Sequence, residues 1–214
     1  MHISDKYNAR FNVKVGVYKD NKLIDQRQSH NVMTNTGRNW LSRLVGASDY
    51  STTPPLAHTT DKVAYVGLGC GGALQTDSRF PKSQTELVTV EALEDPIPFS
   101  IASSVSTYLK KVNGQNANSS VYFPGSFRSR FIIDVAETEI SYTESTTRVS
   151  NVNVGTSVPI SEAGLYLSSA QPTWDGGSLG ADPAGPNSLV CYNIFDPIFV
   201  TPNVVLRVEW ELRF

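Results

Sequence analysis

The sequence is poor in charge. Of its 214 residues, 18% are charged, whereas about 25% is typical of soluble globular domains, and the formal net charge is −2. Because there is neither a basic excess nor an acidic tail, the composition does not favour nucleic acid as a partner. Charged residues are depleted at the cores of protein interfaces. The shortage of charge therefore favours a protein that covers part of its surface with partners.

Cysteine and histidine are also scarce. The chain has two cysteines, Cys70 and Cys191, which are too far apart in sequence to suggest a disulfide framework. One disulfide and two buried thiols both fit this spacing, and the missing framework favours the thiols. The three histidines are scattered at positions 2, 30 and 58, so no zinc-ligand spacing is present.

Other metal and membrane signals are weak or missing. Three acidic residues have side chains of the type that binds calcium, but no D-x-D-x-D-G loop surrounds them: Asp175, Asp182 and Glu162. We therefore expect no metal site and no cofactor. No window approaches the roughly 18 apolar residues of a membrane span, and the N-terminal MHISDKYNARF has no apolar signal region. We expect no membrane association and synthesis in the cytoplasm.

The sequence is instead rich in two-residue hydrophobic periodicity, which predicts strands. The clearest case is 204–214, VVLRVEWELRF, in which every second residue is apolar and most of the others are charged. The same alternation at 9–20, followed by a turn at 19–22 and a return strand from Leu23, predicts a hairpin. Further strand-like segments are 63–68, 87–90, 99–109, 121–123, 127–140, 149–154, 159–167 and 188–195.

One segment has helical spacing. Within Asn31 to Gly46, four apolar residues fall on one helical face: Trp40, Leu41, Leu44 and Val45. Asn35 or Thr36 can cap this helix and Gly46 can end it, which predicts a helix at about 36–45. Many strands and one short helix predict a mainly-β, antiparallel β-sandwich or barrel-like domain. We expect a single domain over 1–214, with an N-terminal arm at about 1–10 and a long loop at 171–187.

A glycine-rich segment matches the dinucleotide-binding fingerprint G-x-G-x-x-G at Gly67, Gly69 and Gly72. That fingerprint requires a helix directly after the glycines, whose N–H groups hold the pyrophosphate. Asp77, Ser78 and Pro81 follow too soon for a crossover helix of normal length. The pattern therefore favours a tight turn or a close approach of strands.

Other apparent catalytic motifs also lack their context. Gly176–Gly180 matches the G-x-S-x-G nucleophile elbow, but both flanks are loop-like and all three histidines precede it. Paired acids at 91 and 94, 137 and 139, and 209 and 211 are typical of solvated strand faces. Arginines at 128, 130, 207 and 213 are candidates for binding an anion or a neighbour's acids, with solvation or intersubunit salt bridges favoured. We therefore expect no enzyme and no catalytic residues.

Four segments together resemble a family of tailed-bacteriophage virion proteins. They are NVMTNTGRNWL at 31–41, AYVGLGCGG at 64–72, ISEAGLY at 160–166, and LVCYNIFDPI at 189–198 with the ending WELRF at 210–214. The resemblance extends over most of the chain from about Asn31. The length of the loop at 171–187 departs from it.

The resemblance implies a structural virion component in the neck, collar, tail or baseplate, made in the host cytoplasm and present in several copies. Its expected partners are identical copies in a symmetric ring or array and other virion proteins. We expect the contacts to come from strand edges and from segments 1–10, 47–61 and 171–187. The alternatives are capsid-surface decoration and a host-glycan-binding module, in which Trp174, Tyr166 and Tyr192 would stack on sugars.

Overall fold

In the computed structural model, the described residues are 10–45, 61–71, 88–94, 96–102, 105–113, 121–123, 128–136, 139, 158–171, 173–174, 188–201 and 203–213. Several sequence predictions fall outside these residues. They include the arm at 1–9, the loop at 47–60, the strand at 149–154, the G-x-S-x-G segment and most of the loop at 171–187.

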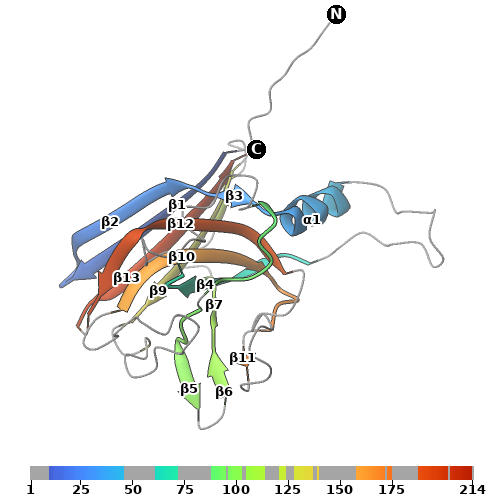
Figure 1. The fold of residues 1–214 in the computed structure, drawn as a ribbon. Helices are drawn as coiled ribbons and strands as arrows, with labels where there is room; N and C mark the ends of the chain where they lie inside the picture. The colour runs from blue at the N-terminus through green and yellow to red at the C-terminus, as the bar shows by residue number, and fades with distance from the viewer. Residues whose placement is uncertain are drawn as a thin grey trace, which may run out of the picture.

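Two five-stranded antiparallel sheets pack face to face as a sandwich (Figure 1). The order of the first sheet is β2 (Lys22–His30), β1 (Arg10–Lys19), β13 (Val205–Arg213), β9 (Arg128–Val135) and β8 (Val121–Phe123). The order of the second sheet is β3 (Val32–Met33), β12 (Leu189–Val200), β10 (Val158–Leu167), β4 (Val63–Gly69) and β7 (Leu109–Lys111). A smaller sheet joins β11 (Thr173–Trp174), β6 (Val105–Thr107) and β5 (Ser100–Ala102). The predicted fold class is confirmed.

The β1–β2 hairpin forms where the sequence predicts it. Asp20 and Asn21 have φ values of 49° and 61°, and Lys19 pairs directly with Lys22. Positive φ at both central residues is the geometry of a two-residue type I′ turn, which matches the twist of the flanking strands. Asp and Asn tolerate this backbone conformation better than other non-glycine residues.

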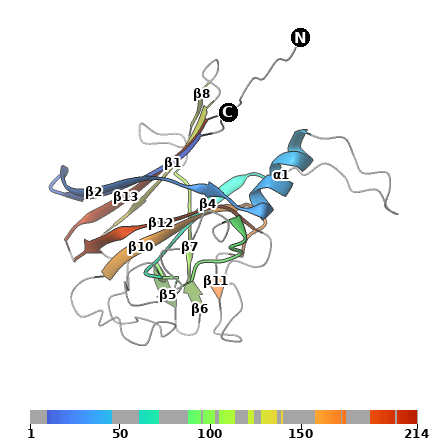
Figure 2. The same cartoon turned by 45° about the horizontal axis from the view of Figure 1, so that its top comes forward.

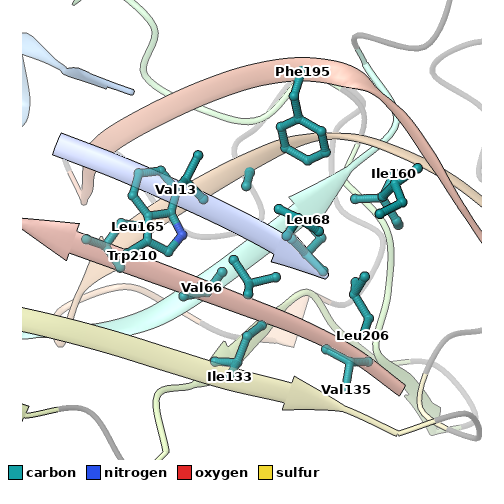
Figure 3. Close-up of a cluster of buried hydrophobic side chains, with 14 of the residues drawn as sticks. Val13, Val66, Leu68, Ile133, Val135, Ile160, Leu165, Phe195, Leu206 and Trp210 are labelled. Carbon is teal, nitrogen blue, oxygen red and sulfur yellow. The ribbon is translucent and has the colours of Figure 1, made fainter. Parts of the chain in front are cut away.

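The core lies between the sheets, and β13 contributes most clearly to it. Leu206, Val208, Trp210 and Leu212 are all buried, and Trp210 pairs with Val13 of β1 and Phe131 of β9. Figure 3 shows Trp210 and Val13 of the first sheet facing Leu165 and Val66 of the second. Full burial of such side chains stabilises the fold by about 1.5–3 kcal/mol each. The alternation predicted for 204–214 is confirmed.

Part of the second sheet is buried on both faces. Residues 88–94, 96 and 97, here called the strap, lie on the face that points away from the first sheet, and Val90 and Leu93 of the strap pack there with Tyr166 and Tyr192. Gly67 and Gly164 are paired across β4 and β10, and a Cβ on either would approach Leu93 to 3.0 or 3.2 Å. The prediction that Gly67 allows a close approach is confirmed.

Several boundaries differ from the predictions. The long strand predicted at 127–140 ends at Val135, and the one predicted at 99–109 is divided among β5, β6 and β7. The predicted strand at 87–90 is wrong, since Val88 is helical and Thr89 lies in a turn. Strand β12 continues past Pro197 to Val200. A register shift opposite Ser161 makes room for the proline, which has no N–H to donate.

Helix α1 (Asn35–Val45) lies at the opposite end of the sandwich from the β1–β2 turn (Figure 1). The predicted helix is confirmed, but Thr34 is its cap rather than Asn35 or Thr36. The N–H of Gly37 donates to Thr34 Oγ1 at 3.0 Å, and Thr34 Oγ1 lies 2.5 Å from the carbonyl oxygen of Leu189. Leu44, predicted on the buried face, is 39% exposed.

Candidate functional site

Among the described residues, Glu162 on β10 is the one acidic side chain that is buried. It is 0% exposed. Its Oε1 accepts a hydrogen bond from the N–H of Gly71 at 3.1 Å. Its Oε2 accepts from the N–H of Glu94 at 3.0 Å and from the hydroxyl of Tyr192 at 2.7 Å. Two backbone donors and one phenol therefore surround the carboxylate.

This arrangement fits a structural carboxylate better than a calcium ligand. Calcium sites use oxygen atoms that are available to the ion, and both oxygens of Glu162 already accept hydrogen bonds inside the protein. The carboxylate joins three parts of the chain: the end of β4 through Gly71, the strap through Glu94, and β12 through Tyr192. Charge-assisted hydrogen bonds of this kind are stronger than neutral ones.

The two tyrosines proposed to stack on glycans are inaccessible. Tyr166 and Tyr192 are both buried. Burial, together with the negative charge of Glu162, raises the pKa of Tyr192 above its ordinary range, so its hydroxyl stays protonated and donates. Trp174, predicted to lie on a loop, belongs to β11 and pairs with Ser106 of β6. For Tyr166 and Tyr192, the glycan-stacking prediction is wrong.

The glycine-rich segment does not form a dinucleotide site in the described residues. Gly67 and Gly69 lie within β4, whose neighbours β10 and β7 are both antiparallel to it. A Rossmann unit needs parallel strands joined by a crossover helix. The N–H of Ile97 donates to the carbonyl of Leu68, and Pro96 forms a bridge with Gly69, so the strap lies along the end of β4.

Both cysteines are buried thiols with no disulfide between them, as the sequence favours. Burial raises the pKa of Cys191 far above its ordinary value, and a hydrogen bond with Asn31 offsets only part of this effect. A thiol that stays protonated is a poor nucleophile and a poor metal ligand. Cys191 therefore has a packing role on β12, where it lies opposite Met33 of β3.

Most of the arginines proposed to bind an anion or a neighbouring subunit have acidic partners in their own sheet. Arg128 Nη1 lies 3.2 Å from Glu211 Oε2, and Arg213 Nε also pairs with Glu211. Arg207 Nε lies 2.6 Å from Asp134 Oδ1, and its guanidinium is 5.5 Å from the ring centre of Tyr18. The intersubunit interpretation is therefore not needed for Arg128, Arg207 or Arg213.

Two members of the acid pairs, Glu211 and Glu139, also have partners within the chain. Glu211 is engaged by two arginines, whereas Glu139 lies in a turn beyond the end of β9. There Glu139 accepts a hydrogen bond from the N–H of Ala136 at 2.6 Å and pairs with Lys110. A glycosidase needs two carboxyl groups facing one substrate bond. These two carboxylates are held by cations and backbone groups of their own chain.

Asp61, just before β4, forms hydrogen bonds with residues just after β10 and with α1. Its carbonyl oxygen accepts a hydrogen bond from Trp40 Nε1 at 2.8 Å, and its carboxylate accepts from the N–H of Ser169 at 3.0 Å. The hydroxyls of Ser168 and Ser169 donate to the same carboxylate. Burial opposes ionisation, but these hydrogen bonds outweigh it and hold the pKa of Asp61 below its ordinary value of 3.8.

This lowered pKa predicts an acid-sensitive contribution to stability. We expect Asp61→Asn to lower the free energy of unfolding at neutral pH, because the amide accepts fewer hydrogen bonds. The folded-state pKa is below the unfolded value of 3.8, so the carboxylate's contribution is complete above that pH and is lost as pH falls through the folded pKa. Urea unfolding of both proteins as a function of pH measures this. A difference that persists unchanged at the lowest pH would contradict it.

Most of the residues that resemble virion proteins lie in the second sheet and α1. Segment 31–41 forms β3 and the start of α1, 64–69 lies in β4, 160–166 lies in β10, and 189–198 lies in β12, whereas 210–213 of the ending lies in β13 of the first sheet. The order β3-β12-β10-β4 makes these strands direct neighbours in the second sheet. Three of the buried polar side chains in these segments, those of Thr34, Glu162 and Tyr192, form hydrogen bonds with one another or with the backbone.

Sequence reasoning missed the Glu162 centre and the Thr34 cap as structural features. The only local signals were a glutamate inside an otherwise apolar strand and a threonine just before the helix. In the part of the chain that the structure describes, no three metal-ligating side chains gather and no helix is long and apolar enough to cross a membrane. Comparisons of the chain with known protein families, curated proteins and solved structures find no match.

Proposed function

We propose that this protein is a structural component of a tailed-bacteriophage virion, assembled in several copies in the neck, collar or tail region. The observation that carries the proposal is that the resembling segments, apart from the ending in β13 of the first sheet, lie in one packed unit made of β3, α1, β12, β10 and β4. Segments that are scattered in sequence but packed together specify one structure jointly. Their combined resemblance therefore weighs more than four separate short matches.

The polar groups of this unit support a structural role. Glu162 uses both oxygens to hold Gly71, Glu94 and Tyr192 together, and Thr34 joins α1 to β12. The Glu162 carboxylate and the Thr34 hydroxyl both form hydrogen bonds inside the protein, whereas a catalytic group must reach a substrate. We infer that the protein acts by assembly and not by catalysis.

The test is the composition of purified particles. We expect quantitative mass spectrometry of density-purified virions to detect peptides of this chain at several copies per particle, with abundant host cytoplasmic proteins depleted as the control. Absence of the chain from intact particles would contradict the proposal. Labelling the chain in imaged particles distinguishes neck, tail and baseplate positions from capsid-surface decoration.

The glycan-binding alternative has lost support, because Tyr166 and Tyr192 are buried in the second sheet. A glycan array tests it directly. We expect no binding above background.

A further inference from the structure

Three arginines lie together on the outward face of the first sheet. Leu212 of β13 is in the core, so its neighbours Glu211 and Arg213 point to the outward face. Arg130 of β9 pairs directly with Glu211, and Arg128 pairs with Arg213. Because directly paired residues of antiparallel strands share a face, both point outward too. We call Arg128, Arg130 and Arg213 the arginine corner. Figure 2 shows β8, which pairs with this part of β9, at the upper end of the first sheet.

Two other rows of the same face are balanced in charge. Arg207 Nε lies 2.6 Å from Asp134 Oδ1 on the neighbouring strand, and Lys14 of β1 is directly opposite Glu209. Each of these rows therefore sets one positive side chain against one negative side chain. In the two rows of the arginine corner, three arginines stand against the single acid Glu211. Positive charge is therefore in excess at this corner.

Strand register adds to this excess. Arg10 of β1 pairs with Arg213, and Arg213 pairs with Arg128, so three adjacent strands carry an arginine at the same position. Like charges directly opposite one another destabilise a sheet. The stability of the fold therefore does not explain this row, whereas a ligand of opposite charge does.

The arginine corner is accessible, and one acid orients it. The side chain of Arg213 is 53% exposed and that of Arg128 is 34% exposed, whereas that of Glu211 is only 14% exposed. Arg128 Nη1 lies 3.2 Å from Glu211 Oε2, and Arg213 Nε pairs with Glu211 Oε1. A guanidinium has five N–H donors in a planar fork. It can therefore bind Glu211 and a second carboxylate at the same time.

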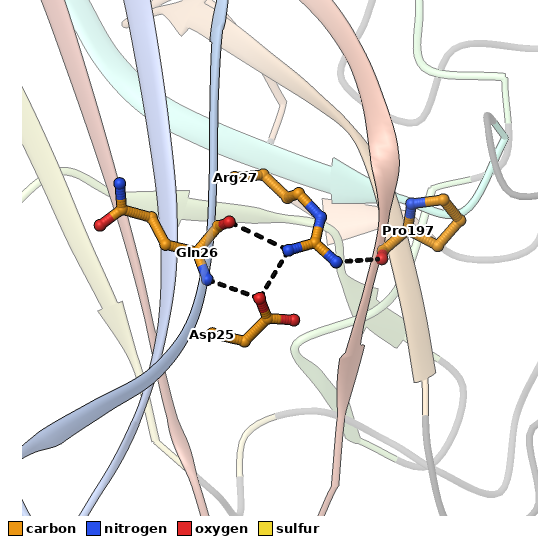
Figure 4. Close-up of polar contacts among 4 residues, drawn as sticks. All are labelled: Asp25, Gln26, Arg27 and Pro197. Carbon is orange, nitrogen blue, oxygen red and sulfur yellow. Dashed lines mark hydrogen bonds and ion pairs between the residues drawn. The ribbon is translucent and has the colours of Figure 1, made fainter.

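Arg27 of β2 illustrates the contrasting case of an arginine used inside the fold. It pairs with Val15 of the core, so its side chain points toward the second sheet. Its guanidinium lies 2.5 Å from Asp25 and donates to the carbonyl oxygen of Pro197 on β12 at 3.3 Å (Figure 4). Arg27 thus joins the two sheets, whereas the arginine corner faces away from them.

The spacing of the arginine corner matches an extended acidic peptide. Arg128 and Arg130 are two residues apart on one strand, which places their Cα atoms about 7 Å apart. Carboxylates at every second position of an extended peptide have the same separation, and arginine binds carboxylates with matching planar geometry. Duplex DNA fits less well. It carries a negative charge every 1.7 Å or so along its axis and would extend over the balanced rows of a chain whose net charge is −2.

We propose that the arginine corner binds an extended acidic segment of a neighbouring protein chain, with aspartate or glutamate at alternate positions. This inference rests on the proposed function, since it names the kind of partner that the virion component contacts. The carboxylates of the partner bind Arg130 and Arg213 and offset the excess charge of the two rows. Because the contact is made between exposed charges, salt weakens it.

The first test measures binding by fluorescence anisotropy with a short rhodamine-labelled peptide of alternating serine and aspartate. We expect the wild type to bind it, with an affinity that falls as sodium chloride is added. Arg130→Gln/Arg213→Gln should raise the dissociation constant at least about fivefold. The matched control is Lys19→Gln/Lys22→Gln, which removes the same charge at the β1–β2 turn and should change the dissociation constant less than about twofold. Circular dichroism confirms that both variants fold.

A second measurement uses only the wild type. In NMR spectra of the isotope-labelled protein, the peptide should shift the backbone amide signals of residues 128–130 and 211–213 and leave those of 19–24 in place. Three results would each overturn the inference: no binding of the peptide, equal binding by the arginine variant, or tighter binding of a DNA duplex through the same arginines. The proposed function is decided separately, by the presence of the chain in purified particles.

Discussion

Replacing Glu162 with alanine is expected to lower the free energy of unfolding by about 4 kcal/mol, because it leaves several buried donors without an acceptor. The N–H groups of Gly71 and Glu94 and the hydroxyl of Tyr192 all donate to this carboxylate. In the alanine variant these donors would face a cavity inside a fully buried site instead of an acceptor. Since domains of this kind are stable by about 5–15 kcal/mol, the loss would remove a large part of the total.

Urea unfolding measures this effect, and two variants control for it. Glu162→Gln keeps the shape and one acceptor oxygen, so we expect a loss of about half that of alanine. Glu209→Gln changes a partly exposed glutamate on β13 and should cost less than about 0.5 kcal/mol. A loss below about 1 kcal/mol for Glu162→Ala would show that the three hydrogen bonds do not hold the strap and β12 to β10.

Replacing Gly37 with alanine is expected to destabilise the protein by about 3 kcal/mol, although alanine normally favours a helix over glycine by about 1 kcal/mol. A Cβ at this position would lie 2.2 Å from the carbonyl oxygen of Val190 and 2.9 Å from Met33 Cγ. The backbone of β12 cannot yield without breaking its pairing, so α1 must move away. Its movement would also strain the cap between Thr34 and Gly37.

The matched control for this variant is Ser42→Ala on the exposed side of the same helix. There the intrinsic preference for alanine is unopposed, and we expect a stability that is unchanged or slightly higher. Thermal and urea unfolding of both variants give the comparison. A Gly37→Ala protein as stable as the wild type would mean that α1 does not pack against β12 at the distance described.

The elements that could be predicted from the sequence are those whose signals are local. The alternation at 204–214 depends on burial of one face, and β13 lies in the middle of the first sheet with that face in the core. The hairpin turn depends on two residues that tolerate positive φ. Strand continuation past Pro197 could not be predicted, because the register shift that accommodates it depends on pairing with β10.

The polar centres escaped prediction because their partners are distant in sequence. Glu162 binds Gly71 and Glu94, which precede it by 91 and 68 residues. Thr34 became the helix cap because its hydroxyl also reaches the carbonyl of Leu189, 155 residues away. A run rich in β-branched residues, such as 87–90, looks strand-like in isolation, but Val90 and Leu93 pack against the second sheet instead.

The position of the chain in the intact virion tests the central claim most directly. An electron cryo-microscopy map of the particle should contain several symmetry-related copies of a sandwich with this strand order. A map at side-chain resolution in which every component is assigned to other chains would contradict the claim that this protein is a virion building block.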